Sequence, residues 1–294
     1  MTDDLTTAAG LAPEPEVSLI VCTRNRAAKL APCLAALAAI RHDGPWELIL
    51  VDNGSTDGTA AVLEAFHREA PVPVRLIHEP RKGLANARNA GLAAARGAVA
   101  AFTDDDCYAA PDLVTRAAEV FADPEVGFVG GRIRLFDPDD IPVTIMESTV
   151  PKRFAPGSFI RTGEIQGANM AFRRSALEQA GGFDPLFGSG AFFPAEDIDA
   201  VAAVSRLGWA GAYDPRLVVF HHHGRREADL PRLTAEYDRG RGAYHMKLLL
   251  GRGAVRAYVQ AQKTLLRRMP REPRSALREL MAGLEYAWRS ALRS

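Results

Sequence analysis

Short apolar runs alternate with helical patterns along the first part of the chain, and this alternation constrains the fold more than any other feature. Four of the runs have the length of buried strands: Val17–Cys22, Glu47–Val51, Val74–His78 and Ala98–Thr103. Between the first two runs, three leucines recur at helical spacing, namely Leu30, Leu34 and Leu37. Strands that are joined through helices form a mostly parallel sheet with helices on its faces. The sequence therefore predicts an α/β fold.

Strand and helix signals continue to residue 223 with wider gaps. A helix is predicted at Leu84–Arg96, and Gly97 suits its C-terminal end. Pro111 favours the start of another helix, and loops are expected at Asp137–Pro142 and Pro151–Gly163. The other predicted elements are helices at Thr59–Arg68, Arg174–Ala180 and Asp197–Leu207, and strands at Val126–Gly131, Gln166–Arg173 and Leu217–His223.

Polar side chains follow each of the four N-terminal strands. The four clusters are Thr23–Arg26, Asp52–Ser55, Arg81–Gly83 and Asp104–Asp106. In open α/β sheets, ligands bind beyond the carboxyl ends of the strands. We therefore expect these clusters to meet in one ligand site.

Three consecutive carboxylates, Asp104–Asp106, end the fourth strand. Carboxylates this close repel one another, and a divalent metal is their usual neutraliser. Three histidines end the last predicted strand, Leu217–His223, with His221 and His223 on one face and His222 on the other. Two aspartates and an imidazole suit Mn²⁺, and Mg²⁺ is also suitable, whereas zinc is less so because no cysteine pair accompanies them.

Other polar residues have two readings each. Asp52 can bind a base or a ribose, or it can simply belong to a turn. Arg81 and Lys82 precede a predicted helix, where they suit a phosphate, or they form a solvated basic loop. The acids of Glu196–Asp199 can supply a general base, or they can favour a helix N-terminus.

The composition is ordinary for a soluble globular protein, with 47% hydrophobic and 24% charged residues among 294. Three cysteines form no disulfide framework, which indicates a reducing cytosol. Residues 1–16 are acidic and rich in Ala and Pro, so we expect a disordered tail rather than a signal peptide. No window holds eighteen apolar residues in a row, so no transmembrane helix and a cytoplasmic location are expected.

The net charge of zero hides an asymmetry. Residues 231–294 contain 14 Lys and Arg and five Asp and Glu, so this helical segment carries +9 and the rest carries −9. Its basic helices can pack on the body of the protein. Alternatively, they can contact an anionic membrane, and the protein would then lie at the inner face of that membrane. The residues to test for this contact are Arg267, Arg268, Arg271 and Arg274. Nucleic acid is not expected as a partner, because the rest of the chain is acidic.

Seven segments in series resemble the inverting family 2 glycosyltransferases, which use nucleotide sugars and have the Rossmann-like GT-A fold. The segments are 17–26, 47–58, 82–91, 101–106, 167–174, 181–184 and 196–199. The resemblance covers roughly Val17 to His223 in the expected order. It implies a catalytic GT-A domain at 17–230 and leaves a basic helical extension at 231–294.

The resemblance implies roles for residues of the donor site. Thr23, Arg26 and Asp52 would line the nucleoside pocket, and Lys82 and Asn86 would lie near the ribose or diphosphate.

The same resemblance implies a metal site with a DXD motif. Asp104 and Asp106 match its outer positions, and His221 would contact the metal or the diphosphate, with His223 as the alternative. The middle residue, Asp105, is assigned to the nucleotide, but as a third carboxylate it leaves open which pair binds the metal.

The acidic segment at 196–199 matches the region that supplies the catalytic base. We expect Asp197 to be this base, with Glu196 beside it. A single displacement with inversion then needs no covalent intermediate.

The sequence therefore predicts a metal-dependent inverting transferase that moves a sugar from a nucleotide diphosphate sugar, by resemblance a UDP-sugar, to an acceptor hydroxyl. The acceptor would be a glycan, a lipid-linked molecule or a small molecule, as in cell-envelope polysaccharide, glycolipid or natural-product glycosylation. One alternative is a sugar nucleotidyltransferase, although no Gly-rich triphosphate loop lies near the N-terminus. Another is a non-catalytic binding protein, which would not need acids at both 104–106 and 196–199.

Overall fold

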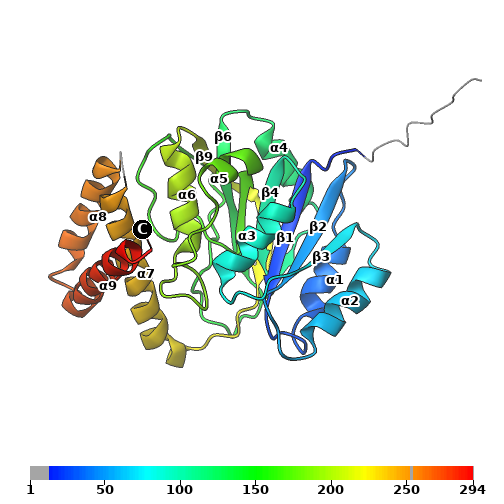
Figure 1. Ribbon diagram of the computed structural model, residues 1–294, viewed down its shortest axis with the longest axis horizontal. Helices are drawn as coiled ribbons and strands as arrows, with labels where there is room; N and C mark the ends of the chain where they lie inside the picture. The colour runs from blue at the N-terminus through cyan, green and yellow to red at the C-terminus, as the bar shows by residue number, and fades with distance from the viewer. Residues whose placement is uncertain (1–12, 252–253, 294) are drawn as a thin grey trace, which may run out of the picture.

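A nine-stranded sheet lies at the centre of the protein, and helices cover both of its faces (Figure 1). The computed structural model describes residues 13–251 and 254–293. Most of the tail predicted to be disordered, residues 1–16, lies outside the described residues. The main strand order is β3-β2-β1-β4-β8-β6-β9-β5, and β7 pairs with β9.

One half of the sheet is parallel, as predicted. It consists of β1 (Val17–Thr23), β2 (Trp46–Asp52), β3 (Val74–His78) and β4 (Val99–Asp104). All seven residues of β2 are buried, as expected for a strand that is covered on both faces. The carboxyl ends of these four strands therefore lie along one edge of the sheet.

The other half of the sheet mixes both strand directions. Its main strands are β6 (Val126–Leu135), β8 (Asn169–Arg173) and β9 (Ala210–His221). Strand β8 runs antiparallel to both β4 and β6, whereas β6 and β9 are parallel. Two short strands, β5 (Cys107–Ala109) and β7 (Lys152–Phe154), pair antiparallel with β9.

Two details of this half differ from the sequence prediction. Strand β7 lies in the segment predicted to be a loop, Pro151–Gly163, and β5 was not predicted. A strand of three residues is too short to show an alternating pattern, so the sequence carried no signal for either of them. The last strand, β9, begins seven residues before the predicted start.

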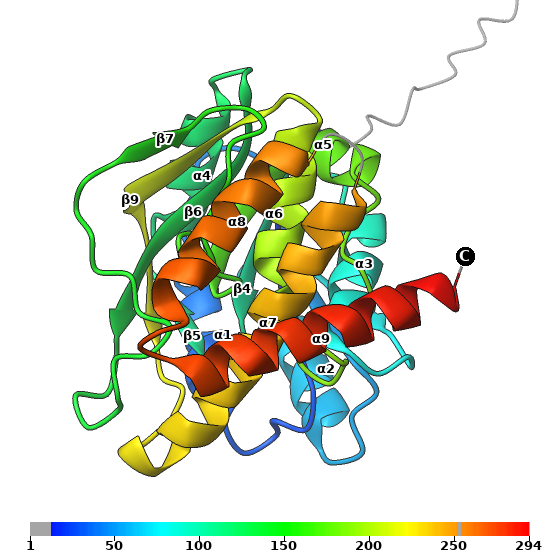
Figure 2. The ribbon, with the colours of Figure 1, turned by 90° about the vertical axis from the view of Figure 1, so that its left-hand side faces the viewer.

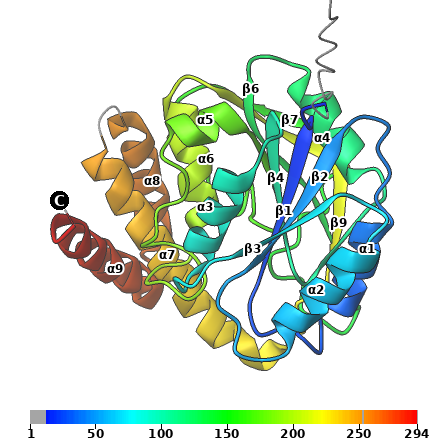
Figure 3. The same ribbon diagram turned by 45° about the vertical axis from the view of Figure 1, so that its right-hand side comes forward.

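Helices form a layer on each face. One face is covered by α1 (Ala31–Ala38), α2 (Thr59–Glu69) and α4 (Leu113–Phe121). The other face is covered by α3 (Leu84–Ala94), α5 (Arg174–Gln179) and α6 (Glu196–Arg206); Figure 3 shows α3 and α6 there.

The end of α3 differs from the prediction. The helix stops at Ala94, so Gly97 is not its C-terminal cap. Gly97 instead lies against β1, where an added Cβ would come within 2.5 Å of the Ser18 nitrogen. The glycine thus allows close backbone packing.

Three further helices pack beside α6 at one end of the molecule (Figure 1). They are α7 (Leu230–Leu250), which follows the short 3₁₀ helix Glu227–Asp229, then α8 (Val255–Arg268) and α9 (Pro273–Ala291). Tyr244 and Leu248 of α7 are buried in the same apolar cluster as Ile198 of α6. Among the described residues, no helix is long and apolar enough to span a membrane. The division into domains at residue 230 stays a prediction.

Candidate functional site

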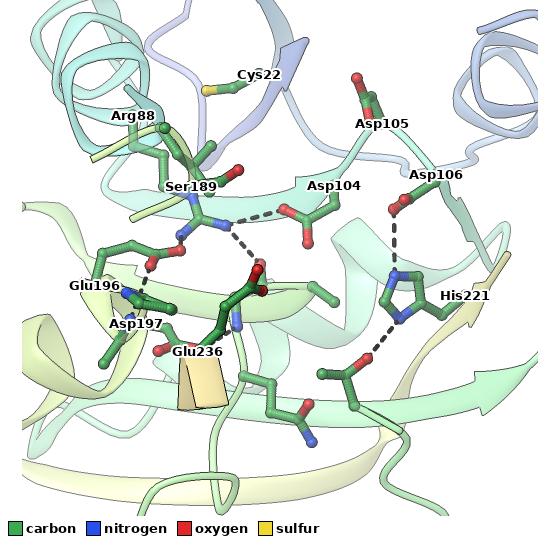
Figure 4. A pocket seen from close by; sticks show the side chains of 18 of the residues that line it. Cys22, Arg88, Asp104, Asp105, Asp106, Ser189, Glu196, Asp197, His221 and Glu236 are labelled. Atoms are coloured by element: carbon green, nitrogen blue, oxygen red, sulfur yellow. Dashed lines mark hydrogen bonds and ion pairs between the residues drawn. The ribbon is translucent and has the colours of Figure 1, made fainter. Parts of the chain in front are cut away.

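A cavity of about 820 Å³ opens at the carboxyl ends of β1 and β4. Two of the four predicted polar clusters, the first and the fourth, contribute three residues each to its wall. The second contributes only Asn53 and the third only Gly83. Figure 4 shows the acidic groups of this wall together with Arg88. The clusters that follow β1, β2 and β4 are adjacent because β1 pairs with both β2 and β4 in parallel register.

Asp104, Asp106 and His221 converge in this cavity. Their potential ligand atoms, together with the Cys107 sulfur, all lie within 4.8 Å of one another. The Nε2 atom of His221 is 3.3 Å from Oδ1 of Asp106. The unpredicted strand β5 brings these residues together, because it pairs Cys107 directly with His221 on β9.

The ligand atoms of this group fit a divalent metal. Burial opposes ionisation of Asp106, but the hydrogen bond and charge of His221 lower its pKa overall. Burial also raises the pKa of Cys107 well above its usual value, so its thiol is protonated and a poor ligand. Two carboxylates and an imidazole remain, a set that suits Mn²⁺.

Asp105 lies apart from this group. Its Oδ2 accepts a hydrogen bond of 2.6 Å from the Thr23 hydroxyl, and its Oδ1 is 3.3 Å from Nε of Arg26. Burial raises the pKa of Asp105 to about 6, although Arg26 and Thr23 oppose the rise. Thr23, Arg26 and Asp105 therefore form one polar unit on the β1 side of the cavity.

Arg88 joins the two acidic regions of the cavity, and the sequence analysis did not identify it. Its side chain is only 2% exposed. One guanidinium nitrogen lies 2.7 Å from Glu196, and the other lies 3.0 Å from Asp104 and 3.2 Å from the Gly167 carbonyl oxygen. Its sequence signal was a charged residue on the buried face of an otherwise Ala-rich helix, α3.

Asp197 is a further carboxylate of the cavity wall whose pKa is raised. It lies in the first turn of α6 and lines the cavity, and Gly167 N–H donates a 2.9 Å hydrogen bond to its Oδ2. Burial and the nearby charge of Glu196 raise the pKa of Asp197 to about 6. The neighbouring Glu196 accepts a 2.7 Å hydrogen bond from Arg88.

The backbone just before these acids is strained. Ala195 has φ of +131°, a conformation that residues with a Cβ rarely adopt. Such strain is concentrated at functional sites, where the surrounding structure enforces it. Ala195 is the residue immediately before α6, whose first turn contains Asp197.

Comparison with known proteins assigns the chain to a family. Residues 18–181, more than half of the chain, match the family model described as glycosyl transferase family 2. The chain belongs to this family. The family match disfavours both the nucleotidyltransferase and the non-catalytic alternatives.

Relatives of known name agree with this family. A pre-mycofactocin glycosyltransferase of Mycobacterium tuberculosis is 30% identical over 216 residues, covering 71% of this chain and 43% of its own length. The glycosyltransferase AglE of Haloferax volcanii is 26% identical, covering 58% of this chain and 56% of its own length. The chain thus spans about half the length, or less, of such relatives.

Solved structures confirm the predicted GT-A fold. A mannosyltransferase of Pyrobaculum calidifontis, in complex with GDP-Man and Mn²⁺, has a TM-score of 0.66 at 23% identity and covers 95% of this chain and 81% of its own. Residues 1–349 of S. aureus TarS, in complex with UDP-GlcNAc, have a TM-score of 0.64 at 15% identity and cover 92% of this chain and 81% of their own.

Three donor residues implied by the family resemblance are not among the described residues that line the cavity. Oδ1 of Asp52 accepts a hydrogen bond from Ser55 N–H, as in a turn. Lys82 is exposed, and Asn86 donates to its carbonyl oxygen. Their roles in donor binding stay predictions.

Asn53 is the residue of the second cluster that does line the cavity. Its side-chain amide donates to the carbonyl oxygens of Glu79 and Arg81 and accepts from Gly83 N–H. It thereby fixes the loop after β3 against the end of β2.

Two other predicted residues have structural partners. Asp199 lies 2.7 Å from the Lys247 ammonium of α7, so it anchors a helix. His223 lies beside Asp140 and is not part of the converging group of Asp104, Asp106 and His221. A second group of possible metal ligands consists of Asp137, Asp140 and His222. The guanidinium of Arg226 already forms ion pairs with both aspartates of this group.

Helix α7 supplies a wall of the cavity that was not predicted. The residues of α7 that line the cavity are Leu233, Glu236, Tyr237 and Arg241. The sequence analysis placed these residues in a separate basic extension, because their charge pattern differs from that of the body. A family-type catalytic domain that ended at residue 230 would lack this wall.

Proposed function

We propose that this protein transfers a sugar from a nucleotide diphosphate sugar to an acceptor hydroxyl, with inversion at the anomeric carbon. The observation that carries this proposal is the placement of Asp197. It is a carboxylate with a pKa raised to about 6, and it lines the same cavity as Asp104, Asp106 and His221. Family membership supplies the reaction class.

In the proposed reaction, Asp197 removes the proton of the acceptor hydroxyl. The hydroxyl oxygen then forms a bond to the anomeric carbon, while the bond from that carbon to the diphosphate oxygen breaks. The Gly167 N–H holds Asp197 in place, and Arg88 fixes Glu196 beside it. A general base with a pKa near the working pH is well matched to this task.

Asp104, Asp106 and His221 would hold a divalent metal, Mn²⁺ or Mg²⁺, which when bound neutralises the leaving diphosphate. Thr23, Arg26 and Asp105 would orient the nucleoside. The choice of a UDP-sugar rests on the sequence resemblance. One solved neighbour holds GDP-Man and another holds UDP-GlcNAc, so the nucleotide base is a matter for experiment.

The acceptor would lie against the wall formed by α7. Relatives of similar identity are named for different molecules, one for pre-mycofactocin and another as a beta-monoglucosyldiacylglycerol synthase of Synechocystis. A glycan, a lipid-linked molecule or a small molecule therefore all remain in the proposal. A lipid-linked acceptor would lie at a membrane surface, and the basic C-terminal helices have the charge to bind one.

Thermal unfolding tests the donor site directly. UDP, GDP, dTDP, CDP and ATP are each added with and without Mn²⁺ to the wild type and to Asp106→Asn. A ligand at 100 times its Kd stabilises the folded state by about 2.7 kcal/mol. We expect one nucleoside diphosphate to raise Tm only with Mn²⁺, and the variant to lose the effect. Preferential stabilisation by ATP, or no ligand effect, would contradict the proposal.

A further inference from the structure

Helix α9 presents an apolar face to solvent. The exposed residues recur every three or four positions: Leu277, Leu280, Met281, Leu284 and Trp288. Leu284 is 62% exposed and Trp288 is 61% exposed. The residues buried against the protein lie on the opposite side of the helix: Ser275, Ala276, Glu279, Ala282, Gly283 and Tyr286. A helix with one face already buried does not need a second apolar face in order to fold.

Helix α8 extends this surface. Val255, Val259 and Leu266 are exposed, whereas Ala257 and Ala261 are buried. Figure 2 shows α8 and α9 on the same side of the molecule. Exposed apolar side chains gathered on two helices of one side of a molecule indicate an interaction site.

These two helices and the turn that joins them carry several cations that form no ion pair among the described residues. Helix α8 contains no Asp or Glu. Five exposed basic residues have no ion pair within the described part of the chain: Arg256, Lys263, Arg267, Arg271 and Arg274. Arg268, which the sequence analysis grouped with them, instead pairs with Glu272 and with the buried Glu279.

Charge decides between two possible occupants of this surface. A second copy of the chain, packed face to face, would bring its own unpaired cations against these five, and like charges repel. An anionic bilayer accepts both components, because acyl chains receive the apolar side chains and headgroups pair with Lys and Arg. Trp288 fits this arrangement, since tryptophan is enriched at membrane–water interfaces.

We propose that the outer face of α8 and α9 binds the surface of an anionic lipid bilayer. The apolar side chains of α9 enter the interfacial layer, and the five unpaired cations lie among the headgroups. This binding needs neither donor nor turnover, so it does not rest on the proposed reaction.

The proposed orientation brings the cavity close to the lipid. Arg241 of α7 lines the cavity and also donates a 2.7 Å hydrogen bond to Glu279 of α9. The cavity wall is therefore separated from the lipid-facing side of α9 by about one helix diameter, roughly 10–12 Å. An acceptor held at the bilayer surface could reach the cavity without leaving the interface.

Vesicle co-sedimentation of the full chain tests the inference. The vesicles contain phosphatidylcholine alone or phosphatidylcholine mixed with phosphatidylglycerol. We expect binding only to the anionic vesicles, with weaker binding at high salt. Replacing Arg267 and Arg274 together (Arg267→Ser, Arg274→Ser) removes two cations and should weaken binding roughly 30-fold, about fivefold for each charge. The pair Leu284→Ser and Trp288→Ser should also lose binding.

Matched controls carry the same changes elsewhere. Arg41→Ser with Arg68→Ser removes two exposed cations, and Val150→Ser with Leu207→Ser removes two exposed apolar side chains. Both pairs should bind vesicles like the wild type, and so should Asp197→Asn, which separates this inference from the proposed reaction. Equal binding to both vesicle types would overturn the inference. So would a dimer in light scattering that Leu284→Ser with Trp288→Ser converts to a monomer while vesicle binding is absent.

Discussion

Arg88 is a single side chain on which two regions of the cavity depend. It pairs with Asp104 at the end of β4 and with Glu196 at the start of α6, and it is almost fully buried. Removing one partner from a buried ion pair leaves the others without compensation, which typically costs about 3–5 kcal/mol. We therefore expect Arg88→Met to lower both the free energy of unfolding and the rate of sugar transfer, as measured by urea unfolding and by donor turnover.

A control variant and a conservative variant accompany Arg88→Met. Arg68→Met changes an exposed arginine on α2 and should leave both quantities nearly unchanged. Arg88→Lys keeps the charge but cannot form the same forked contacts, so it should recover stability only in part. Wild-type stability in Arg88→Met would show that the two acids do not need this cation.

Asp197 should control the acid side of the pH profile. A base must be unprotonated to act, and burial together with Glu196 raises the pKa of Asp197 to about 6. Turnover should therefore be full above pH 7 and should fall as the pH drops through about 6, as measured by kcat between pH 5 and 9. A kcat that is flat down to pH 5 would exclude Asp197 as the base.

Replacing the same side chain tests its role independently of pH. Asp197→Asn keeps the size of the side chain but cannot take a proton, so turnover should fall about 10²–10⁴-fold. The Mn²⁺-dependent rise in Tm with the nucleoside diphosphate should persist, because Asp197 is not in the converging metal group. Loss of that rise would mean that the substitution disrupts the donor site.

The sequence indicated that Asp104, Asp106, His221 and Asp197 would lie in one site, and all four line one cavity. Their roles in binding and catalysis stay predictions. Arg88 was missed because its partners lie 16 and 108 residues away along the chain. Such pairings depend on the tertiary fold, which local patterns do not record.

At the scale of elements, α7 and α9 cross at a glycine. A Cβ added to Gly242 would lie 2.0 Å from the Glu279 carbonyl oxygen, which belongs to the backbone and cannot move aside. Gly242→Ala should therefore separate the two helices and lower Tm by several degrees in a thermal unfolding scan. Gly58→Ala is the matched control, because its Cβ would meet only Ala27 at 3.6 Å. Equal Tm values for the two variants would contradict the close crossing.

The sequence indicated most of the longer elements but not the shortest strands. The parallel strands β1 to β4 and helices α2, α3 and α6 lie close to the predicted bounds. Helices α7, α8 and α9 were predicted only together, as a helical segment over residues 231–294. Strands β5 and β7 have three residues each, and what defines them is pairing with β9. No sequence period can reveal a strand that exists only through its partner.

At the scale of the whole molecule, the predicted boundary at residue 230 can be tested by truncation. Phe187 and Phe193 of the body pack against Tyr286 of α9, and Lys247 of α7 lies 2.7 Å from Asp199 of α6. Exposing each large apolar side chain costs about 1.5–3 kcal/mol. A chain that ends at residue 230 should therefore lack a cooperative unfolding transition, as measured by circular dichroism. A sharp transition in the fragment would confirm an independent domain.

The two walls of the cavity come from different parts of the chain. Thr23, Arg26 and Asp104 lie within residues 18–181, which match the family model, whereas Glu236 and Tyr237 of α7 lie beyond that match. In the proposed enzyme, the first wall faces the donor and the second faces the acceptor. Related proteins could therefore evolve to use new acceptors through recombination or substitution in the C-terminal segment. The residues that bind the sugar donor would stay unchanged.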